Sequence, residues 1–407
     1  MTANRKCAGK ASLLTILGIE SERRTAMGRT DMASVPPMGW NSWNTFYDSY
    51  DANMIMEVAD AMVDKGYLKA GYQYLILDDC WAQADRDDNG DLVPDPEKFP
   101  DGIEPVISYI HDRGLKFGIY SSCGVRTCVG RPGSFEHEYQ DAARFAEWGV
   151  DFLKYDNCHR PNGIPSAPLY RRMSMALRNS GREILLAACQ WGTENVSEWI
   201  RSTGAHTYRS TVDIQDRWES IKSITDQRLS CLSDGAAGCF NDMDMLVCGM
   251  YGRGSNPETS KGGCTEDEYQ THFALWAMLN SPLIIGCDVR SADYRTKSLL
   301  QNRDLIAINQ DPECRSCFTL KCECDPEGIA LVRPLSGGEY AVGMFNFADT
   351  EMKMGVTFWD MGLSSESGKQ IKCHDCLKQE DIGVLKDCYV DRLPAHGCKV
   401  IRCSLTE

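Results

Sequence analysis

Between residues 35 and 311, short apolar runs alternate with longer segments whose apolar residues recur at helical spacing. After Asp51, for example, Met54, Val58 and Met62 recur every four residues, and Asp51 is placed to cap that helix. The other helical segments are 103–113, 136–148, 169–179, 195–202, 218–229 and 265–279. The strand-like runs are 38–40, 72–77, 115–120, 150–155, 184–188, 206–209, 243–247 and 282–285. Eight strands with intervening helices predict a parallel (β/α)8 TIM barrel rather than an open sheet.

After Pro312 the pattern changes to strand-like runs without a long helix between them. The runs lie at 318–321, 329–332, 340–347, 354–358 and 399–401, and turn residues such as Ser336-Gly337-Gly338 separate them. This pattern predicts a C-terminal antiparallel β-sandwich. The chain then divides into an N-terminal extension (1–34), the barrel (35–312) and the sandwich (313–407). Because no flexible linker is evident, we expect the last two to pack directly together.

The N-terminal extension has mixed signals. Basic residues precede an apolar run at 11–19, as in a signal peptide, but the charged run 20–24 follows without a small-residue cleavage site. We therefore expect a disordered extension on a cytoplasmic protein, with export as the alternative. No apolar run reaches the roughly 20 residues of a membrane span, so no membrane partner is expected. The sequence leaves the oligomeric state open, a homo-oligomer included.

The net charge and the cysteine content limit the partners and cofactors that the chain is expected to bind. A net charge of -15 argues against a nucleic-acid partner, because phosphates would be repelled. Without a convincing signal peptide, most of the 20 cysteines are expected to be free thiols. One cluster of four cysteines could hold zinc: Cys314, Cys317, Cys322 and Cys324. Its second pair lacks the spacing of common zinc sites, so we favour a cysteine-rich loop without a metal.

Polar and aromatic residues follow the predicted barrel strands, where the active site of a parallel barrel lies. They include Asp78-Asp79-Cys80-Trp81, Tyr120, Lys154-Tyr155-Asp156, Gln190-Trp191, Arg209, Asp213, Asp242 and Asp244. Taken singly, each residue has an alternative role in the structure alone: as a helix cap, as part of an ion pair such as Lys154 with Asp156, or as a core tryptophan. Together, at the same end of successive strands, they indicate a sugar site, in which aromatic faces contact the ring and charged groups bind its hydroxyls.

These residues also fall into motifs that resemble glycoside hydrolase family 27, the α-galactosidases and α-N-acetylgalactosaminidases. The resemblance covers about 36–312 and continues into the sandwich. Seven motifs occur in the family's order: Met38-Gly39-Trp40-Asn41-Ser42-Trp43, Leu77-Asp78-Asp79-Cys80-Trp81, Leu115-Lys116-Phe117-Gly118-Ile119-Tyr120, Lys154-Tyr155-Asp156-Asn157-Cys158, Arg209-Ser210-Thr211-Val212-Asp213-Ile214, Asn241-Asp242-Met243-Asp244-Met245-Leu246 and Ala307-Ile308-Asn309-Gln310-Asp311-Pro312. One such motif is a weak signal, whereas seven in order are specific.

The resemblance implies a role for each matching position. Asp156 would be the nucleophile and Asp213 the general acid/base of a retaining enzyme that releases terminal α-linked galactose, without a metal or organic cofactor. The substrate-binding residues would be Trp40, Asp78, Asp79, Tyr120, Lys154, Gln190, Trp191, Arg209 and Asp244. Cys128 and Cys158 match a pair that family members often join as a disulfide.

The expected mechanism sets different protonation states for the two carboxyl groups. Asp213 must begin protonated, and we expect burial and the charge of Asp156 to raise its pKa, whereas Asp156 must stay ionised, helped by Lys154.

One departure bears on the substrate: many family members have glutamate where this chain has Gln190. Glutamine is not small enough to admit an acetamido group, so galactose is favoured over N-acetylgalactosamine. The Asp78-Asp79 pair favours a hexose over β-L-arabinopyranose. A non-catalytic carbohydrate-binding relative is the alternative of a different class, and it would be expected to lack one of the two carboxylates.

Overall fold

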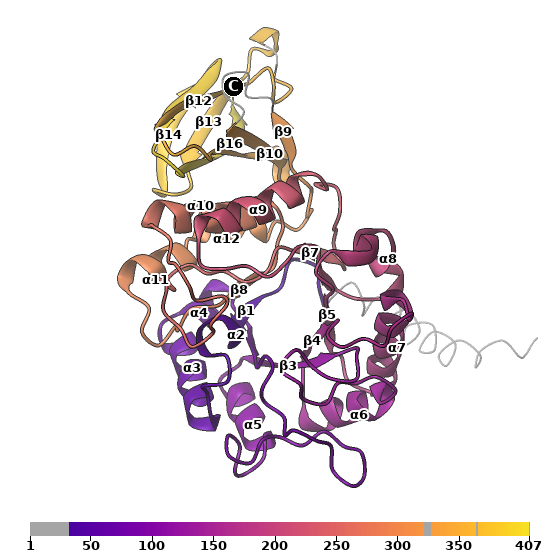
Figure 1. Cartoon of the computed structure of the whole chain (residues 1–407). Coiled ribbons are helices and arrows are strands. Elements are labelled where there is room, and N and C mark those ends of the chain that lie inside the picture. The colour runs from indigo at the N-terminus through magenta and orange to yellow at the C-terminus, as the bar shows by residue number, and fades with distance from the viewer. Residues whose placement is uncertain (1–31, 321–326, 364, 407) are drawn as a thin grey trace, which may run out of the picture.

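The computed structural model describes residues 32–320, 327–363 and 365–406 (Figure 1). Eight strands pair in parallel in the order β7-β6-β5-β4-β3-β2-β1-β8, as the apolar runs predicted. Their bounds are β1 Met38–Asn41, β2 Tyr74–Ile76, β3 Lys116–Ser122, β4 Phe152–Asp156, β5 Leu185–Cys189, β6 Thr207–Arg209, β7 Phe240–Asp242 and β8 Leu283–Ile285. Strands in a barrel are buried on both faces, which explains their apolar runs.

The barrel closes through the segment that follows β7. The Leu246 N–H donates to the Ile284 carbonyl at 2.7 Å, and the Gly286 N–H donates to the Leu246 carbonyl at 2.9 Å. The prediction of strand seven at 243–247 was therefore wrong in its bounds, since β7 ends at Asp242. Asp244 interrupts the strand with a φ of 78°, while the apolar residues after it stay buried in the core.

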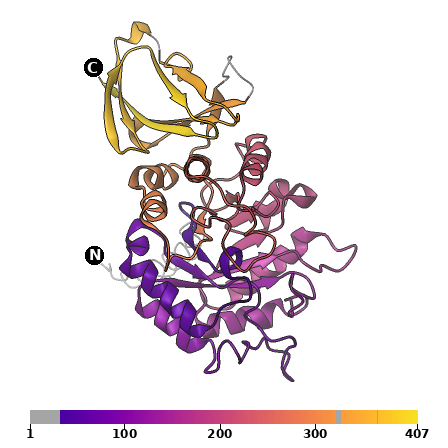
Figure 2. The ribbon, with the colours of Figure 1, turned by 60° about the vertical axis from the view of Figure 1, so that its left-hand side comes forward.

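Helices follow most strands and cover the outside of the barrel (Figure 2). The Asp51 side chain accepts from the Met54 N–H at 2.8 Å, which confirms the predicted cap of α3. No helix among the described residues combines the length and apolarity of a membrane span. The helices are α2 Trp43–Phe46, α3 Ala52–Asp64, α4 Tyr67–Ala70, α5 Glu104–Asp112, α6 Glu138–Trp148, α7 Ser166–Asn179, α8 Val196–Thr203, α9 Trp218–Leu229, α10 Glu266–Met278, α11 Tyr294–Leu300 and α12 Arg303–Asn309.

The C-terminal part is an antiparallel β-sandwich, as predicted. A six-stranded sheet of order β14-β13-β16-β11-β10-β9 faces the two-stranded sheet β12-β15. Val342 and Ile401 of the larger sheet pack with Met354 and Val356 of the smaller one. The strands are β9 Phe318–Leu320, β10 Gly328–Pro334, β11 Tyr340–Asn346, β12 Met352–Thr357, β13 Gln370–Asp375, β14 Glu380–Leu385, β15 Cys388–Leu393 and β16 Cys398–Thr406.

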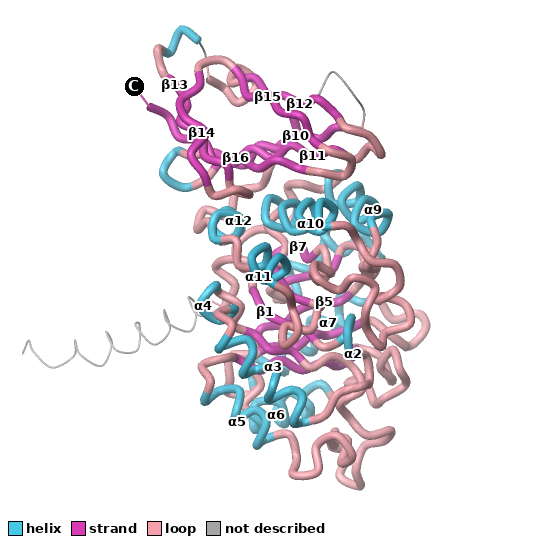
Figure 3. Tube along the Cα trace, turned by 90° about the vertical axis from the view of Figure 1, so that its left-hand side faces the viewer, coloured by secondary structure: helices cyan, strands magenta, loops and turns pink. Residues whose placement is uncertain are grey.

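The sandwich packs on the barrel through α9, α10 and α12, which lie between the two (Figures 1 and 3). Trp218 of α9 stacks on Phe347 and His396 of the sandwich, with ring centroids 5.4 and 4.4 Å apart. The buried Arg333 guanidinium donates to the Ala277 carbonyl of α10 at 3.0 Å. The two modules therefore form one packed interface without a spacer.

Both histidines of the sandwich lie at this interface, each between two carboxylates. His374 contacts Asp381 of the sandwich through Nδ1 at 2.8 Å and Asp304 of α12 through Nε2 at 3.0 Å. His396 lies in the same way between Asp349 and Glu268 of α10. An imidazole donates from both nitrogens only when it is protonated. Accordingly, hydrogen bonds to Asp381 and Asp304 raise the pKa of His374.

We expect the His374→Gln variant to lose stability mainly below neutral pH. A histidine pKa raised by folding stabilises the protein fully below the unfolded value of about 6.5, and this contribution is lost as the pH rises through the folded value. The loss of one charge-assisted pair, about 1 kcal/mol, should lower the melting temperature by about 1–3 °C at pH 5.5 and by less at pH 8.5. His137→Gln, at a position where Nδ1 faces Gln140, is the matched control. An equal decrease at both pH values would contradict the assignment.

Candidate active site

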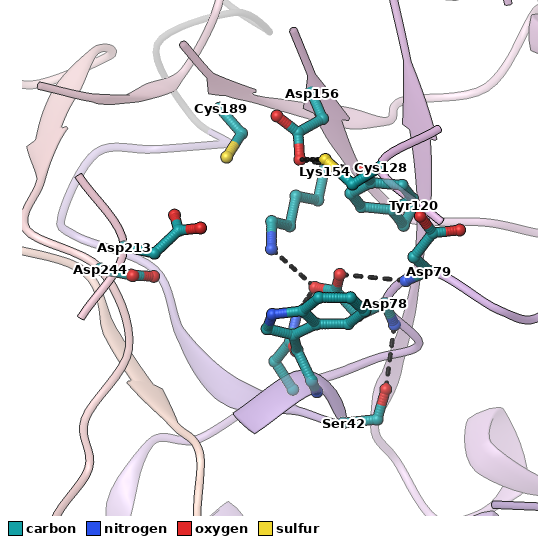
Figure 4. A network of polar contacts seen from close by, with 12 residues as sticks. Ser42, Asp78, Asp79, Tyr120, Cys128, Lys154, Asp156, Cys189, Asp213 and Asp244 are labelled. Carbon is teal, nitrogen blue, oxygen red and sulfur yellow. Dashed lines mark hydrogen bonds and ion pairs between the residues drawn. The ribbon is translucent and has the colours of Figure 1, made fainter. Parts of the chain in front are cut away.

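Alternate residues of the barrel strands point inward, and near the C-terminal ends these residues become polar. In β4, Phe152 belongs to the apolar cluster inside the barrel, so its period-two neighbours Lys154 and Asp156 also face inward. The same alternation carries Tyr74 and Ile76 of β2 on to Asp78. Figure 4 shows Asp78, Lys154 and Asp156 around a common space.

Lys154 and Asp78 form a buried ion pair at the floor of this space. The Lys154 Nζ lies 2.7 Å from Asp78 Oδ2, which also accepts from the Asn41 side chain at 2.7 Å. The Ser42 hydroxyl accepts from the Asp78 N–H at 3.0 Å. Burial alone would lower the pKa of Lys154, but the negative charges of Asp78 and Asp156 outweigh it and raise the pKa. Lys154 is therefore a permanent cation whose direct partner is Asp78, not Asp156.

Asp79, the residue after Asp78, is also buried and borders the same space. Its oxygens accept from the N–H groups of Cys80 at 2.8 Å and Val129 at 3.2 Å. Burial nevertheless raises the pKa of Asp79 to about 6. The two adjacent carboxyl groups thus present oxygen acceptors that suit sugar hydroxyl groups.

Each oxygen of the Asp156 carboxylate has its own donor. Oδ1 accepts from the Asn157 N–H at 2.7 Å and Oδ2 from the Tyr120 hydroxyl at 2.8 Å. Burial, together with the nearby charge of Asp213, raises the pKa of Asp156 to about 7, although Lys154 lowers it. The sequence expectation that Lys154 keeps Asp156 ionised captured the sign of the lysine contribution but not the larger effect of burial.

Asp213 lies beyond β6 and is held by Arg209. The Arg209 guanidinium, buried at the end of β6, lies 3.0 Å from Asp213 Oδ1 and 3.0 Å from Asp244 Oδ1. The Asp213 side chain is 56% exposed, so the burial expected for it was wrong. Figure 4 shows Asp156 and Asp213 directed into the same space from different sides.

Asp244 has a structural contact as well as its contact with Arg209. Its Oδ2 accepts from the Ile214 N–H at 2.8 Å, one residue after Asp213. Its carbonyl accepts from the Trp276 indole of α10 at 2.7 Å. Asp244 therefore fixes both Arg209 and the backbone that carries Asp213.

The loop after β5 presents Gln190 and Trp191. Gln190 is fully buried, and its Nε2 donates to the Thr193 hydroxyl at 2.6 Å. Trp191 is half-buried with a φ of 60°. Gly192 has no room for a side chain, because a Cβ there would lie 2.1 Å from the Ser210 carbonyl of the next loop. The loop is thus packed directly against the segment that leads to Asp213.

The aromatic residues divide into two groups. Tyr120 reaches Asp156 directly, whereas Trp40 is fully buried and donates from its indole to the Cys287 carbonyl at 2.8 Å. Trp81 donates to the Tyr120 carbonyl and packs edge-on against Trp148, as a core tryptophan would.

Cys128 and Cys158 are joined by a disulfide beside Asp156. The Sγ of Cys128 lies 3.6 Å from Asp156 Oδ2 (Figure 4). The same loop supplies the Val129 N–H that binds Asp79. The disulfide therefore fixes a segment that contacts two carboxylates of the site.

Two of the four cysteines of the candidate zinc cluster belong to the described residues. Cys314 and Cys317 donate to the backbone carbonyls of Ser34 at 3.2 Å and Met278 at 3.0 Å, whereas Cys322 and Cys324 lie outside the described residues. Among the described residues, the cluster with metal-ligand proximity is Cys128, Asp156 and Cys158, and the disulfide between its two cysteines leaves no thiolate to bind a metal.

Three residues near the site were missed by the sequence analysis, which did name Asp242 among the polar residues that follow the strands. Asn41 and Ser42 bind Asp78, and Cys189 is the last inward residue of β5. Asn41 and Cys189 border a small internal cavity together with Lys154, Arg209 and Asp242. Their position at the strand ends was a usable signal, but an amide, a hydroxyl and a thiol carry no charge to draw attention to them.

Two family models match nearly all of the structured chain. The model described as Alpha galactosidase A matches residues 35–311, and the model described as Alpha galactosidase C-terminal beta sandwich domain matches residues 327–403. They correspond to the barrel and to the sandwich.

Individual relatives agree with the family models. The α-galactosidase of Coffea arabica is 43% identical over 349 residues, which cover 86% of this chain and 88% of the relative. The α-galactosidase of Cyamopsis tetragonoloba is 39% identical over 378 residues and covers 93% and 88%. The crystal structure of α-galactosidase I from Mortierella vinacea superposes with a TM-score of 0.85 at 31% identity, and covers 91% of this chain and 97% of that one.

Proposed function

This chain belongs to the α-galactosidase family of glycoside hydrolases, and we propose that it releases terminal α-linked galactose with retention of configuration. Asp156 acts as the nucleophile and Asp213 as the acid/base. The observation that carries this proposal is the pair of carboxylates at the ends of β4 and β6, which face one space next to the Lys154–Asp78 pair. A non-catalytic binding relative would not need both groups.

The geometry suits the nucleophile role of Asp156. Donors at each oxygen hold the carboxylate in one orientation, and Lys154 adds positive charge nearby. Ionised Asp156 attacks the anomeric carbon and forms a glycosyl ester, while the leaving oxygen takes a proton from Asp213. The sugar ring hydroxyls bind Asp78, Asp79 and Lys154.

The exposure of Asp213 suits its second role. After the aglycone leaves, water must approach the ester, and Asp213 removes its proton as the water attacks. A carboxyl group open to solvent on one side and bound to Arg209 on the other can exchange protons with water between turnovers. Two inversions at the anomeric carbon return the α configuration.

Gln190 supports galactose over N-acetylgalactosamine. Its side chain is fully buried and bound to Thr193, so this position offers no space of the kind that a small residue would leave for an acetamido group. The Asp78-Asp79 pair supports a hexose with a 6-hydroxyl over β-L-arabinopyranose.

We expect 4-nitrophenyl α-galactoside to be cleaved at least about tenfold faster than the α-N-acetylgalactosaminide or β-L-arabinopyranoside, since one misplaced or missing polar contact costs about 1–3 kcal/mol. Initial rates on the three glycosides, with NMR of the first product, test both parts. The first sugar detected should be the α anomer. An initial β product would overturn retention, and a preference for the acetamido sugar would overturn the specificity but not the mechanism.

A further inference from the structure

The loop that carries Asp213 connects β6 to α9. The Asp213 side chain is 56% exposed, and its described contact is with Arg209. A proton donor must reach the leaving oxygen within hydrogen-bond distance, so the placement of this exposed carboxyl depends on how the backbone is held on each side.

Three residues after Asp213, Asp216 is completely buried and forms hydrogen bonds through both its side chain and its backbone. Its carboxylate accepts from the Tyr269 hydroxyl of α10 at 2.8 Å and from the Gly252 N–H at 2.7 Å. Its own N–H donates to the Thr259 carbonyl at 3.0 Å, and its carbonyl accepts from the Gly263 N–H at 2.7 Å. Asp216 thus joins the Asp213 loop to the loop that follows β7.

The groups that hold Asp216 are themselves fixed. The Tyr269 hydroxyl accepts from the N–H groups of Tyr251 at 2.7 Å and Cys264 at 3.3 Å, so its proton is left for Asp216. The same loop bonds back to the barrel, since the Ser255 N–H donates to the Thr45 carbonyl at 2.7 Å. The Tyr269 hydroxyl and the Gly252 N–H are therefore both donors to the Asp216 side chain, and only a carboxylate can accept from both.

Asp244 accepts from the Ile214 N–H, between Asp213 and Asp216, and contacts Arg209 on the N-terminal side of Asp213. Asp213 therefore lies within a short segment whose two flanks are anchored by buried carboxylates. Asp244 borders the sugar-binding rim, whereas the contacts of Asp216 are directed away from it toward α10.

We propose that Asp216 is a positioning residue for the acid/base, and that it acts by holding the backbone that aims Asp213 at the leaving oxygen. This inference rests on the proposed function. It assigns Asp216 no contact with the substrate. Its loss should impair proton donation while leaving the nucleophilic attack of Asp156 intact.

Leaving groups separate these two effects. Phenyl α-galactoside needs a proton on its leaving oxygen, whereas 2,4-dinitrophenyl α-galactoside does not, because its phenolate is stable. In Asp216→Asn, the asparagine amide would face a donor, so the loop should shift. We expect kcat/KM for the phenyl substrate to fall about 30–300-fold, and for the dinitrophenyl substrate by less than about 5-fold, within the range that general acid catalysis supplies.

Three further variants make the result decisive. Asp213→Ala should show the same dependence on the leaving group, only larger. Tyr269→Phe removes one donor to Asp216 and should show a smaller effect of the same kind, and it serves as the test if Asp216→Asn does not fold. Asp141→Asn, which breaks a buried pair with Arg86, should affect both substrates equally.

The outcomes distinguish the two proposals. Equal loss on both substrates in folded Asp216→Asn and Tyr269→Phe, in an otherwise active enzyme, would overturn the positioning role and leave the proposed function standing. A wild-type protein that cleaves neither galactoside would overturn the function itself. A selective loss on phenyl α-galactoside supports the positioning role.

Discussion

Asp156→Asn should reduce kcat on 4-nitrophenyl α-galactoside by at least about 10,000-fold, the magnitude typical for removal of a covalent nucleophile. Asparagine keeps the size of the side chain and can still accept from the Asn157 N–H, so the fold and sugar binding should persist. Retention of more than about 1% of the wild-type kcat would contradict the assignment of Asp156 as nucleophile. Isothermal titration with galactose would show whether the dead variant still binds sugar.

The same variant should be more stable than the wild type at alkaline pH. Folding raises the pKa of Asp156 from an ordinary value of 3.8 to about 7, so between these values the folded state binds more protons than the unfolded state. Stability therefore falls as the pH rises through this window, by an amount on the order of 4 kcal/mol for this group. Asparagine carries no charge, so the variant does not lose this stability as the pH rises.

We therefore expect the melting temperature of Asp156→Asn to exceed that of the wild type by about 1–4 °C at pH 8, with little or no gain at pH 5. Asp141→Asn gives the opposite sign, because it leaves Arg86 buried without its partner. A destabilised Asp156→Asn at pH 8 would show that the hydrogen bonds of the carboxylate outweigh its burial cost.

The sequence predicted the barrel well because parallel strands buried on both faces leave continuous apolar runs, as at 184–188. Strand seven was misplaced because Met243, Met245 and Leu246 are apolar for a different reason: they fill the core on both sides of the turn at Asp244. In the sandwich, β13, β14 and β15 were missed, since one exposed face and residues such as Glu380 and Asp381 break the apolar pattern.

The site was predicted as a set of residues more readily than as a set of contacts. Period-two alternation places Lys154 and Asp156 on one face of β4, and their neighbours at the strand ends follow from the topology. The alternation does not predict which side chains from different strands form ion pairs. Lys154 bonds to Asp78, 76 positions earlier, and no spacing rule favours that partner over Asp156. The exposure of Asp213 likewise depends on the path of its loop, which the buried Asp216 anchors.

Lys154→Met should move the acidic limb of the pH profile of kcat/KM. In the wild type, activity should fall as the pH drops through the Asp156 pKa of about 7, because the nucleophile must be ionised. Lys154 lowers that pKa, so its removal should raise the value and shift the limb upward by about one unit or more.

Lys154→Met should also reduce kcat/KM about 100- to 10,000-fold at pH 7, since the sugar loses a charged contact and less Asp156 is ionised. Loss of a buried partner should cost about 3–5 kcal/mol of stability, because Asp78 is left unpaired. Lys154→Arg keeps the charge, so its acidic limb should stay within about half a unit of the wild type even if its bulk weakens sugar binding. An unmoved limb in Lys154→Met would confine the lysine to sugar binding and assign the ionisation of Asp156 to other groups.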